Sequence, residues 1–278
     1  MENKYYNKRS VILFKYGGNA MSDDGLKKEV LENICLFKKK YDVVIVHGGG
    51  PFIKSALKGA NIESEFIDGH RITTAEAFEC VEKVLKGKVG GNLVKIINKL
   101  GYKAVGLSGK DGNMVLANKR MHKRLVKGKS VEVDLGLVGN IVKVDPSLIK
   151  LLLENDYIPV ISCLASGTSE NDYNINGDMF AGHIAGALNV SKYIVLTDVD
   201  GLLHDKNDPN SLIREIDLSE MSALIKKNII QGGMIPKMES CEIAINKGAQ
   251  SARIINGTIP DQILAIIDEH QVGTLITK

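Results

Sequence analysis

The chain has 278 residues, 44% of them hydrophobic, and a formal net charge of +3 at pH 7. This length and apolar content suffice for one large domain or two lobes with a substantial core, and they exclude a disordered chain. The small net charge and the lack of a dense Lys/Arg block argue against nucleic-acid binding, and no apolar run reaches the roughly 18 residues of a membrane span.

Short apolar runs alternate with longer amphipathic ones along the chain, which predicts an α/β protein with a mainly parallel sheet. The predicted strands, in chain order, are Val11 to Lys15, Val43 to His47, Ala104 to Leu107, Ile158 to Cys163, Tyr193 to Thr197, Ala252 to Ile255 and Thr274 to Thr277.

The clearest predicted helix runs from Thr74 to about Lys86, and we expect it to open with a capping box of Thr73 and Glu76. Alternating β-type residues from Met114 to Val144 predict hairpins over one edge of the sheet. A polar, glycine-bearing segment over residues 161–171 marks a soft boundary, so we expect an N-terminal lobe of residues 1–165 and a C-terminal lobe of residues 166–278.

Two of the predicted strands end in runs of glycine. Lys15 is the last strand residue before Gly17 and Gly18, and Gly48 to Gly50 follow the second strand and precede Pro51, a residue typical of a first helical turn. Glycine permits close approach to the backbone, and a helix N-terminus attracts anions. The two turns therefore predict an anion site at the strand ends; a solvated surface lysine is the alternative reading of Lys15.

Further motifs place charged side chains at element ends. Arg71 in "GHRITTAE" stands beside a helix start, where a guanidinium can grip a carboxylate, although a surface ion pair is the alternative. "NINGDMFAG" puts Asn174, Asn176 and Asp178 on one side of an extended segment before a small-residue helix. "LTDVDGLL" ends a strand in aspartates and glycine, and "IIQGGMIPK" ends in Lys237.

Other familiar signatures are missing. The EF-hand-like start of "DYNINGDMFAGH" ends in His183 instead of a glutamate, and no H-E-x-x-H pair occurs, so no protein metal site is predicted. No G-x-G-x-x-G follows the first strand, which disfavours a dehydrogenase. The four isolated cysteines predict reduced thiols, and without a signal-peptide pattern we expect a cytoplasmic location.

Taken together, "KYGGNAM", "HGGGP", "GHRIT", "GLSGKDG", "GLVGNI", "NINGDMFAG", "LTDVDGLL" and "GGMIPK" resemble the acetylglutamate kinase branch of the amino acid kinase family, over Val11 to Ile276. The resemblance implies a three-layer αβα sandwich around a mainly parallel open sheet. It also implies ATP-dependent phosphorylation of the side-chain carboxylate of N-acetyl-L-glutamate, the second step of arginine biosynthesis. The N-terminal lobe would hold acetylglutamate and the dimer interface, and the C-terminal lobe ATP.

The resemblance also implies roles for individual residues. Lys15 matches the lysine that contacts the transferring phosphate, Lys237 the lysine on the leaving diphosphate, and Asp178 the aspartate that orients both. The positions matching acetylglutamate contacts or lying close to the reacting groups are Gly18, Gly48, Gly49, Gly50, Arg71, Asn174 and Asn176. The nucleotide-binding positions are Asp198, Val199, Asp200, Gly201, Leu202, Leu203, Ile229, Ile230 and Gln231. Magnesium would enter with ATP.

On this interpretation Gly48 to Gly50 lend backbone N–H groups to the substrate and the migrating phosphoryl group, and Gly49→Val abolishes binding or turnover without unfolding the protein. Asp261 or Gln262 stands where arginine-inhibited relatives carry a histidine, and only about ten residues precede the first strand. Both features favour an arginine-insensitive homodimer joined across the Thr74 helix. The ending "VGTL" leaves feedback inhibition open, and a PII-type regulator is a further possible partner.

Two rival functions share most of these motifs. A kinase for a carrier-linked aminoadipate or glutamate would differ around Arg71 and Asn174, so an acceptor screen separates it from an acetylglutamate kinase. A non-catalytic nucleotide-binding regulator would be expected to lack Lys15, Lys237 or Asp178, and all three are present.

Overall fold

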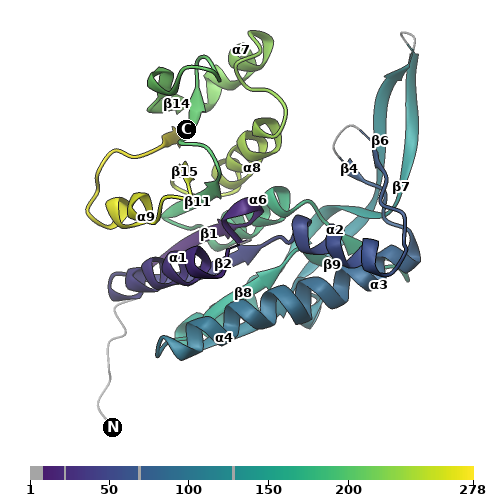
Figure 1. Cartoon of the computed structure of the whole chain (residues 1–278), viewed down its shortest axis with the longest axis horizontal. Helices are drawn as coiled ribbons and strands as arrows, with labels where there is room; N and C mark the ends of the chain where they lie inside the picture. The colour runs from purple at the N-terminus through teal and green to yellow at the C-terminus, as the bar shows by residue number, and fades with distance from the viewer. Residues whose placement is uncertain (1–8, 22, 68–69, 127–128) are drawn as a thin grey trace.

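The computed structural model describes residues 9–21, 23–67, 70–126 and 129–278. Its main sheet has the strand order β14-β16-β15-β11-β1-β2-β8-β5, and adjacent strands are parallel apart from the antiparallel β15–β16 pair (Figure 1). The strands of this sheet, in chain order, are β1 (Ser10–Tyr16), β2 (Tyr41–His47), β5 (Ala104–Ser108), β8 (Ile158–Ser162), β11 (Lys192–Thr197), β14 (Glu215–Asp217), β15 (Ala252–Asn256) and β16 (Thr274–Thr277).

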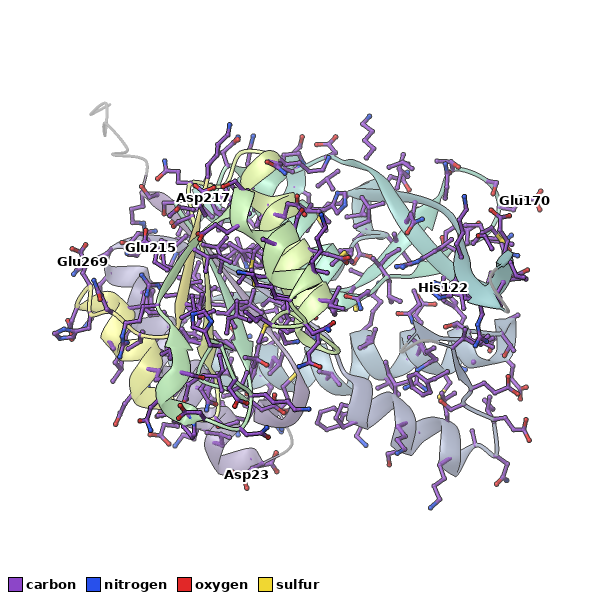
Figure 2. The ribbon with its side chains drawn as sticks, turned by 90° about the horizontal axis from the view of Figure 1, so that it is seen from above. Asp23, His122, Glu170, Glu215, Asp217 and Glu269 are labelled. Carbon is purple, nitrogen blue, oxygen red and sulfur yellow. The ribbon has the colours of Figure 1, made fainter. Side chains whose placement is uncertain are left out.

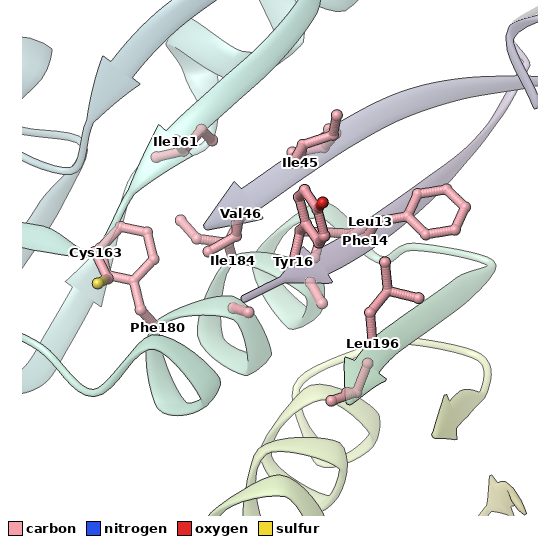
Figure 3. Packing of buried hydrophobic residues seen from close by; sticks show 14 of the residues in the cluster. Leu13, Phe14, Tyr16, Ile45, Val46, Ile161, Cys163, Phe180, Ile184 and Leu196 are labelled. Carbon is pink, nitrogen blue, oxygen red and sulfur yellow. The ribbon is translucent and has the colours of Figure 1, made fainter. Parts of the chain in front are cut away.

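All seven predicted strands are present in this sheet, within one or two residues of their predicted ends. The central strands are buried on both faces, as their unbroken Val/Ile/Leu/Phe runs indicate. Figure 3 shows this core, where Phe180 and Ile184 of a covering helix approach Val46 and Tyr16. Only the edge strand β14 was not predicted, because three residues are too few to show periodicity.

Helices cover both faces of the sheet, which gives the three-layer αβα arrangement (Figure 1). Their bounds are α1 (Asp24–Leu36), α2 (Gly50–Gly59), α3 (Ala75–Glu82), α4 (Gly91–Lys99), α5 (Ser147–Glu154), α6 (Gly177–Leu188), α7 (Met221–Lys226), α8 (Met234–Asn246) and α9 (Pro260–Ile267). No helix in the described part of the chain has the length and apolar content to cross a membrane.

The predicted helix after Thr74 is confirmed, but its predicted cap is wrong. Thr74 is the N-cap, and its hydroxyl accepts a hydrogen bond from Ala77 N at 3.1 Å. Thr73 cannot cap the helix because its backbone pairs with a neighbouring strand: Thr73 N donates to Leu135 O at 2.9 Å, and Leu137 N donates to Thr73 O at 2.7 Å. The N-cap therefore lies one residue later than predicted, and Ala77 at N3 has no side chain that could complete a capping box.

The helix does not end at Lys86. α3 passes into a π-helical segment, η3 (Lys83–Gly90), and then into α4, so one long helical rod runs over residues 75–99. π-Helices are rare and are often found at functional sites. This one lies against the end of β2, as described below.

The alternating segment after β5 forms the predicted hairpin, made of β6 (Val115–Val126) and β7 (Lys129–Val144). With β9 (Leu164–Gly167) and β10 (Tyr173–Asn174) these strands close into a small barrel. The hairpin projects from the sheet in Figure 1. Figure 2 shows His122 and Glu170 at this end of the molecule, opposite Glu215, Asp217 and Glu269. Short pairs β3 (Phe66–Ile67)–β4 (His70–Arg71) and β12 (Leu202–Leu203)–β13 (Leu212–Ile213) complete the strands.

Candidate active site

The two glycine turns lie side by side at the carboxyl end of the sheet. β1 and β2 are parallel with Tyr16 opposite His47, so both chains leave the sheet at the same level. Gly48 N donates a hydrogen bond to Tyr16 O at 3.2 Å, which ties one turn to the other. A Cβ atom added to Gly17 would lie 3.3 Å from Lys15 Nζ and 3.8 Å from Gly48 N. The strand ends therefore bring a cation and both glycine turns into one place.

Asp178 joins the two predicted lysines. Its carboxylate lies 2.7 Å from Lys15 Nζ and 3.4 Å from Lys237 Nζ, and its side chain is 9% exposed. Burial acts to raise the pKa of Asp178, but the charges and hydrogen bonds of Lys15 and Lys237 outweigh burial and hold this pKa below its ordinary value. Asp178 is therefore ionised at neutral pH, and the cluster contains two cations and one anion.

Asp178 is positioned by the first turn of α6. Asn176 is the N-cap, and its Oδ1 accepts hydrogen bonds from Asp178 N at 2.9 Å and Met179 N at 3.2 Å. A Cβ on Gly177 would lie 3.7 Å from Gly48 Cα and 3.8 Å from Lys15 Cε. The N-terminus of α6 thus points its positive end at the same glycine turns.

The triple glycine differs in detail from the sequence-based expectation. The N–H of Gly48 is already bonded to Tyr16 O, so Gly49 and Gly50 are left, and neither N–H has an acceptor among the described residues. A Cβ on Gly49 would lie 2.8 Å from Leu85 Cδ2. A valine at Gly49 would press on the end of the buried Leu85 side chain, so the substitution changes packing as well as the space for a ligand, and its effect on folding stays a prediction.

At Gly48 and Gly50, in contrast, an added Cβ meets no heavy atom of the described residues within 4 Å. Neither residue has a positive φ. The backbone would accept an alanine at these positions, so Gly48 and Gly50 leave open space beside the free N–H groups of Gly49 and Gly50. Such an arrangement suits an anionic ligand.

Arg71 and Asn174 lie in two short strands, β4 and β10, that belong to different sheets. Arg71 is in β4, hydrogen-bonds Ser64 Oγ and lies 4.6 Å from the centre of the Phe66 ring. Burial lowers the pKa of its guanidinium from the ordinary value. Asn174 is in β10, paired with Val138 and Leu164. The contacts found for Arg71 do not join it to the lysine cluster, and Gly69 of its motif lies outside the described residues.

The predicted nucleotide segments lie after β11 and before α8. Asp198 to Leu203 leave the end of β11, where Gly201 has a φ of 143° that a side chain rarely adopts. Ile229 to Gln231 precede α8, which carries Lys237. Asp200 Oδ1 accepts hydrogen bonds from Asn256 Nδ2 at 3.0 Å and Gln262 Nε2 at 3.1 Å.

Asn256 and Gln262 were missed as contacts of this loop. The side chain of Gln262 also binds the backbone of Asn256, since Gln262 Oε1 accepts a hydrogen bond from Asn256 N at 3.0 Å. No sequence spacing links residues 200, 256 and 262, so only the fold reveals this network. Gln262, one of the two residues that the sequence comparison aligned with a histidine of arginine-inhibited relatives, is hydrogen-bonded inside the protein.

Within the described residues, no group of three or more His, Cys, Asp or Glu side chains is arranged to hold a metal ion. The cluster of Lys15, Asp178 and Lys237 instead carries a net positive charge. An αβα sheet with two lysines, an aspartate between them and the uncapped N-terminus of α2 at its strand ends is the architecture of a phosphotransferase that binds acidic ligands.

The chain belongs to the amino acid kinase family, whose model matches residues 10–256. Acetylglutamate kinase from Methanococcus aeolicus is 44% identical over 269 residues, which cover 96% of this chain and 92% of the relative. Acetylglutamate kinase from Pelotomaculum thermopropionicum is 44% identical over 278 residues, 99% of this chain and 94% of the relative. The crystal structure of smu.665 from Streptococcus mutans shares the fold with a TM-score of 0.75 at 28% identity, covering 96% of this chain and 98% of that one.

Proposed function

We propose that this protein transfers a phosphoryl group from ATP to the side-chain carboxylate of N-acetyl-L-glutamate, the second step of arginine biosynthesis, and does so in the cytoplasm. The observation that supports the proposal is the buried Lys15–Asp178–Lys237 cluster beside two glycine turns, in a chain 44% identical to acetylglutamate kinases over nearly its whole length.

The charges of the cluster suit this reaction. Acetylglutamate is ionised at neutral pH, so its carboxylate needs no general base to act as the nucleophile. The difficulty is to bring one anion against another. A lysine about 4 Å from a phosphate oxygen contributes on the order of 4 kcal/mol at an effective dielectric constant near 20, before desolvation costs. The lowered pKa of Asp178 fits a role in orienting Lys15 and Lys237, not in accepting a proton.

The proposed ligands divide between the two lobes. In residues 1–165, Gly49, Gly50 and Arg71 would hold acetylglutamate with Asn174 from across the boundary. In residues 166–278, Asp198 to Leu203 and Ile229 to Gln231 would hold the nucleotide. Magnesium would arrive with ATP and neutralise charge on the phosphates, because the ion is usually held by phosphates and few protein groups.

Trapping of the acyl phosphate with hydroxylamine tests the proposal. The purified protein is incubated with Mg-ATP and N-acetyl-L-glutamate, and ADP release and hydroxamate are measured together. Equal amounts of both would support carboxylate phosphorylation. No hydroxamate from acetylglutamate, with hydroxamate from a carrier-linked aminoadipate or glutamate, would reassign the acceptor. Nucleotide binding without turnover on any acceptor would indicate a regulator.

Three further features of the proposal need separate measurements. A homodimer joined across the rod of residues 75–99 predicts twice the chain mass in light scattering, and a hexamer would contradict it.

The same hydroxamate assay with added L-arginine tests the expected lack of feedback inhibition. Added PII-type protein tests for a regulatory partner in the same way.

A further inference from the structure

His47 is the last residue of β2 and stands immediately before the triple glycine. Its side chain is fully buried, with 0% of the residue exposed. Its Nδ1 lies 3.0 Å from Gly48 O. A carbonyl oxygen can only accept, so this hydrogen bond requires the proton on Nδ1 and leaves Nε2 bare in the neutral ring. Burial lowers the pKa of His47 to about 4, so the ring is neutral at pH 7.

The other edge of the ring faces the π-helical segment η3. A Cβ added to Gly90 would lie 3.1 Å from His47 Nε2 and 3.0 Å from Leu85 O, so the glycine makes room for the imidazole. Nε2 has no hydrogen-bond partner among the described residues. Leaving the buried Nε2 without a partner costs stability. We therefore attribute the presence of this histidine to the hydrogen bond that its Nδ1 makes.

The same π-helical segment supports the glycine turn itself. Leu85 Cδ2 and Val89 Cγ2 would lie 2.8 and 3.4 Å from a Cβ on Gly49. η3 therefore packs against both the ring of His47 and the backbone of Gly49, which fixes their positions relative to each other.

The hydrogen bond of His47 sets the direction of one peptide group. The C=O of Gly48 and the N–H of Gly49 belong to the same planar trans peptide, so they point in opposite directions. When the ring draws the carbonyl oxygen to itself, the N–H of Gly49 points away from the ring. That N–H has no acceptor among the described residues. A reversed peptide would turn a carbonyl oxygen outward, where it would repel an anion.

We propose that His47 is a positioning residue, which donates from Nδ1 to Gly48 O and thereby presents the N–H of Gly49, and not the carbonyl of Gly48, to the anionic ligand. The identification of that ligand as the transferred phosphoryl group rests on the proposed function. Hydrogen-bond donors fixed in advance are effective because they need no reorganisation during the reaction.

Three substitutions separate positioning from simple packing. His47→Asn keeps an amide donor where Nδ1 stands, His47→Gln moves the donor toward the place of Nε2, and His47→Leu removes it. We expect kcat of His47→Leu and His47→Gln to fall about 10- to 100-fold. This fall is no larger than the one that follows removal of an oxyanion-hole donor in other enzymes. His47→Asn should stay within about fivefold of the natural protein, while the Kd for ATP changes less than about threefold in all three.

Thermal unfolding of the three variants provides the control. Asparagine leaves a larger cavity than leucine, so a merely structural role predicts that His47→Asn is the least stable and the least active. Activity that follows Tm in this way, or equal kcat in all three variants, would overturn the proposal. Activity that follows the donor position would support it.

A second measurement does not depend on turnover. Nitrogen-15 NMR of histidine-labelled protein at pH 7, with the signals assigned by their loss in His47→Asn, reports which ring nitrogen carries the proton. A proton on Nδ1 is expected, and one on Nε2 would overturn the proposal. If the natural protein forms no hydroxamate, the proposed function fails, while the position of the proton still decides the interaction between His47 and Gly48.

Discussion

Two clusters of charged side chains lie at opposite ends of the central strands, and they differ in charge balance. At the amino ends of β1 and β2, two basic and two acidic side chains form ion pairs: Arg9, Lys38, Asp42 and Asp156. At the carboxyl end, two basic side chains share one carboxylate: Lys15, Lys237 and Asp178. The first cluster is neutral, and the second keeps an uncompensated positive charge.

The difference separates charges that hold the fold from charges that await a ligand. Burying a charge without a partner costs several kcal/mol, so a balanced cluster is the expected arrangement where only stability matters. An excess cation in the interior is retained where an anionic ligand completes the pairing. Substitutions in the two clusters should therefore act on different properties of the protein.

Lys15→Met should have the largest effect. Methionine keeps the length of the side chain but removes the charge, and loss of about 4 kcal/mol of transition-state stabilisation lowers kcat about 1,000-fold. Asp178 keeps its pairing with Lys237, so Tm should change little. Hydroxamate formation and thermal unfolding measure the two effects. Lys28→Met is the matched control, because Lys28 is 65% exposed and pairs only with Glu32 among the described residues.

Asp42→Asn should lower the stability of the protein and leave kcat nearly unchanged, which is the opposite of the result expected for Lys15→Met. Its carboxylate is 13% exposed and lies 2.9 Å from Arg9 Nη2 and 3.8 Å from Lys38 Nζ. Removing the charge leaves two cations with one carboxylate, and we expect the free energy of unfolding to fall by about 2 kcal/mol, less than for a fully buried pair because Arg9 is partly exposed. Urea unfolding measures the loss. A kcat that also fell more than about twofold would break the distinction between the clusters.

Gly48→Ala tests whether a ligand lies close to the backbone at the carboxyl end of the strands. The added methyl group meets no described atom within 4 Å, so the free protein should keep its stability, whereas a ligand held close to the backbone would be displaced. We expect kcat/KM to fall about tenfold, a change of about 1.4 kcal/mol. Gly59→Ala, at the end of the helix that follows and with equally open space, is the control. Unchanged kinetics of Gly48→Ala would show that nothing binds close to this glycine.

Asp156→Asn should have the smallest effect. Hydrogen bonds from Lys38 and Arg9 lower the pKa of Asp156, so its ionised form stabilises the fold above the unfolded pKa of about 4, and this contribution is lost as pH falls through the lower folded value. The carboxylate is 56% exposed and screened by solvent, which limits the loss at pH 7 to under about 1 kcal/mol. Asparagine tolerates the positive φ of 65° at this position.

Unfolding curves of the natural protein and Asp156→Asn between pH 7 and pH 2 test the sign. The difference in stability should shrink as the solution becomes more acidic. A difference that grew on acidification would mean that the pKa is raised and that the assigned ion pairs are absent.

The sheet could be predicted from sequence because its strands are local signals. Each of the seven predicted strands is a run of apolar residues between turns, and parallel strands buried on both faces make such runs continuous. Lys15, Asp178 and Lys237 were also identified from motifs at strand and helix ends. The three-residue strand β14 and the true cap at Thr74 depend on neighbours far along the chain, which no local spacing records.

The parts of the site that sequence did not reveal depend on contacts between distant elements. His47 reads as an ordinary strand residue until the fold places η3 against its ring. Asn256 and Gln262 reach Asp200 only because β11 and β15 are adjacent in the sheet. The π-helical turn has no local signature either, since the surrounding residues follow the pattern of an ordinary amphipathic helix.

The central place of β1 has a consequence for synthesis of the protein. β1 pairs on one side with β2, which follows it closely, and on the other with β11; Ser191 Oγ donates to Val11 O across a separation of 180 residues. At about 5–20 residues per second, the ribosome takes roughly 10–40 s to make that interval. During this time one edge of β1 is unpaired and open to other strands. The strand bearing Lys15 therefore gains its second neighbour late, and the nascent chain is most exposed to aggregation before β11 emerges.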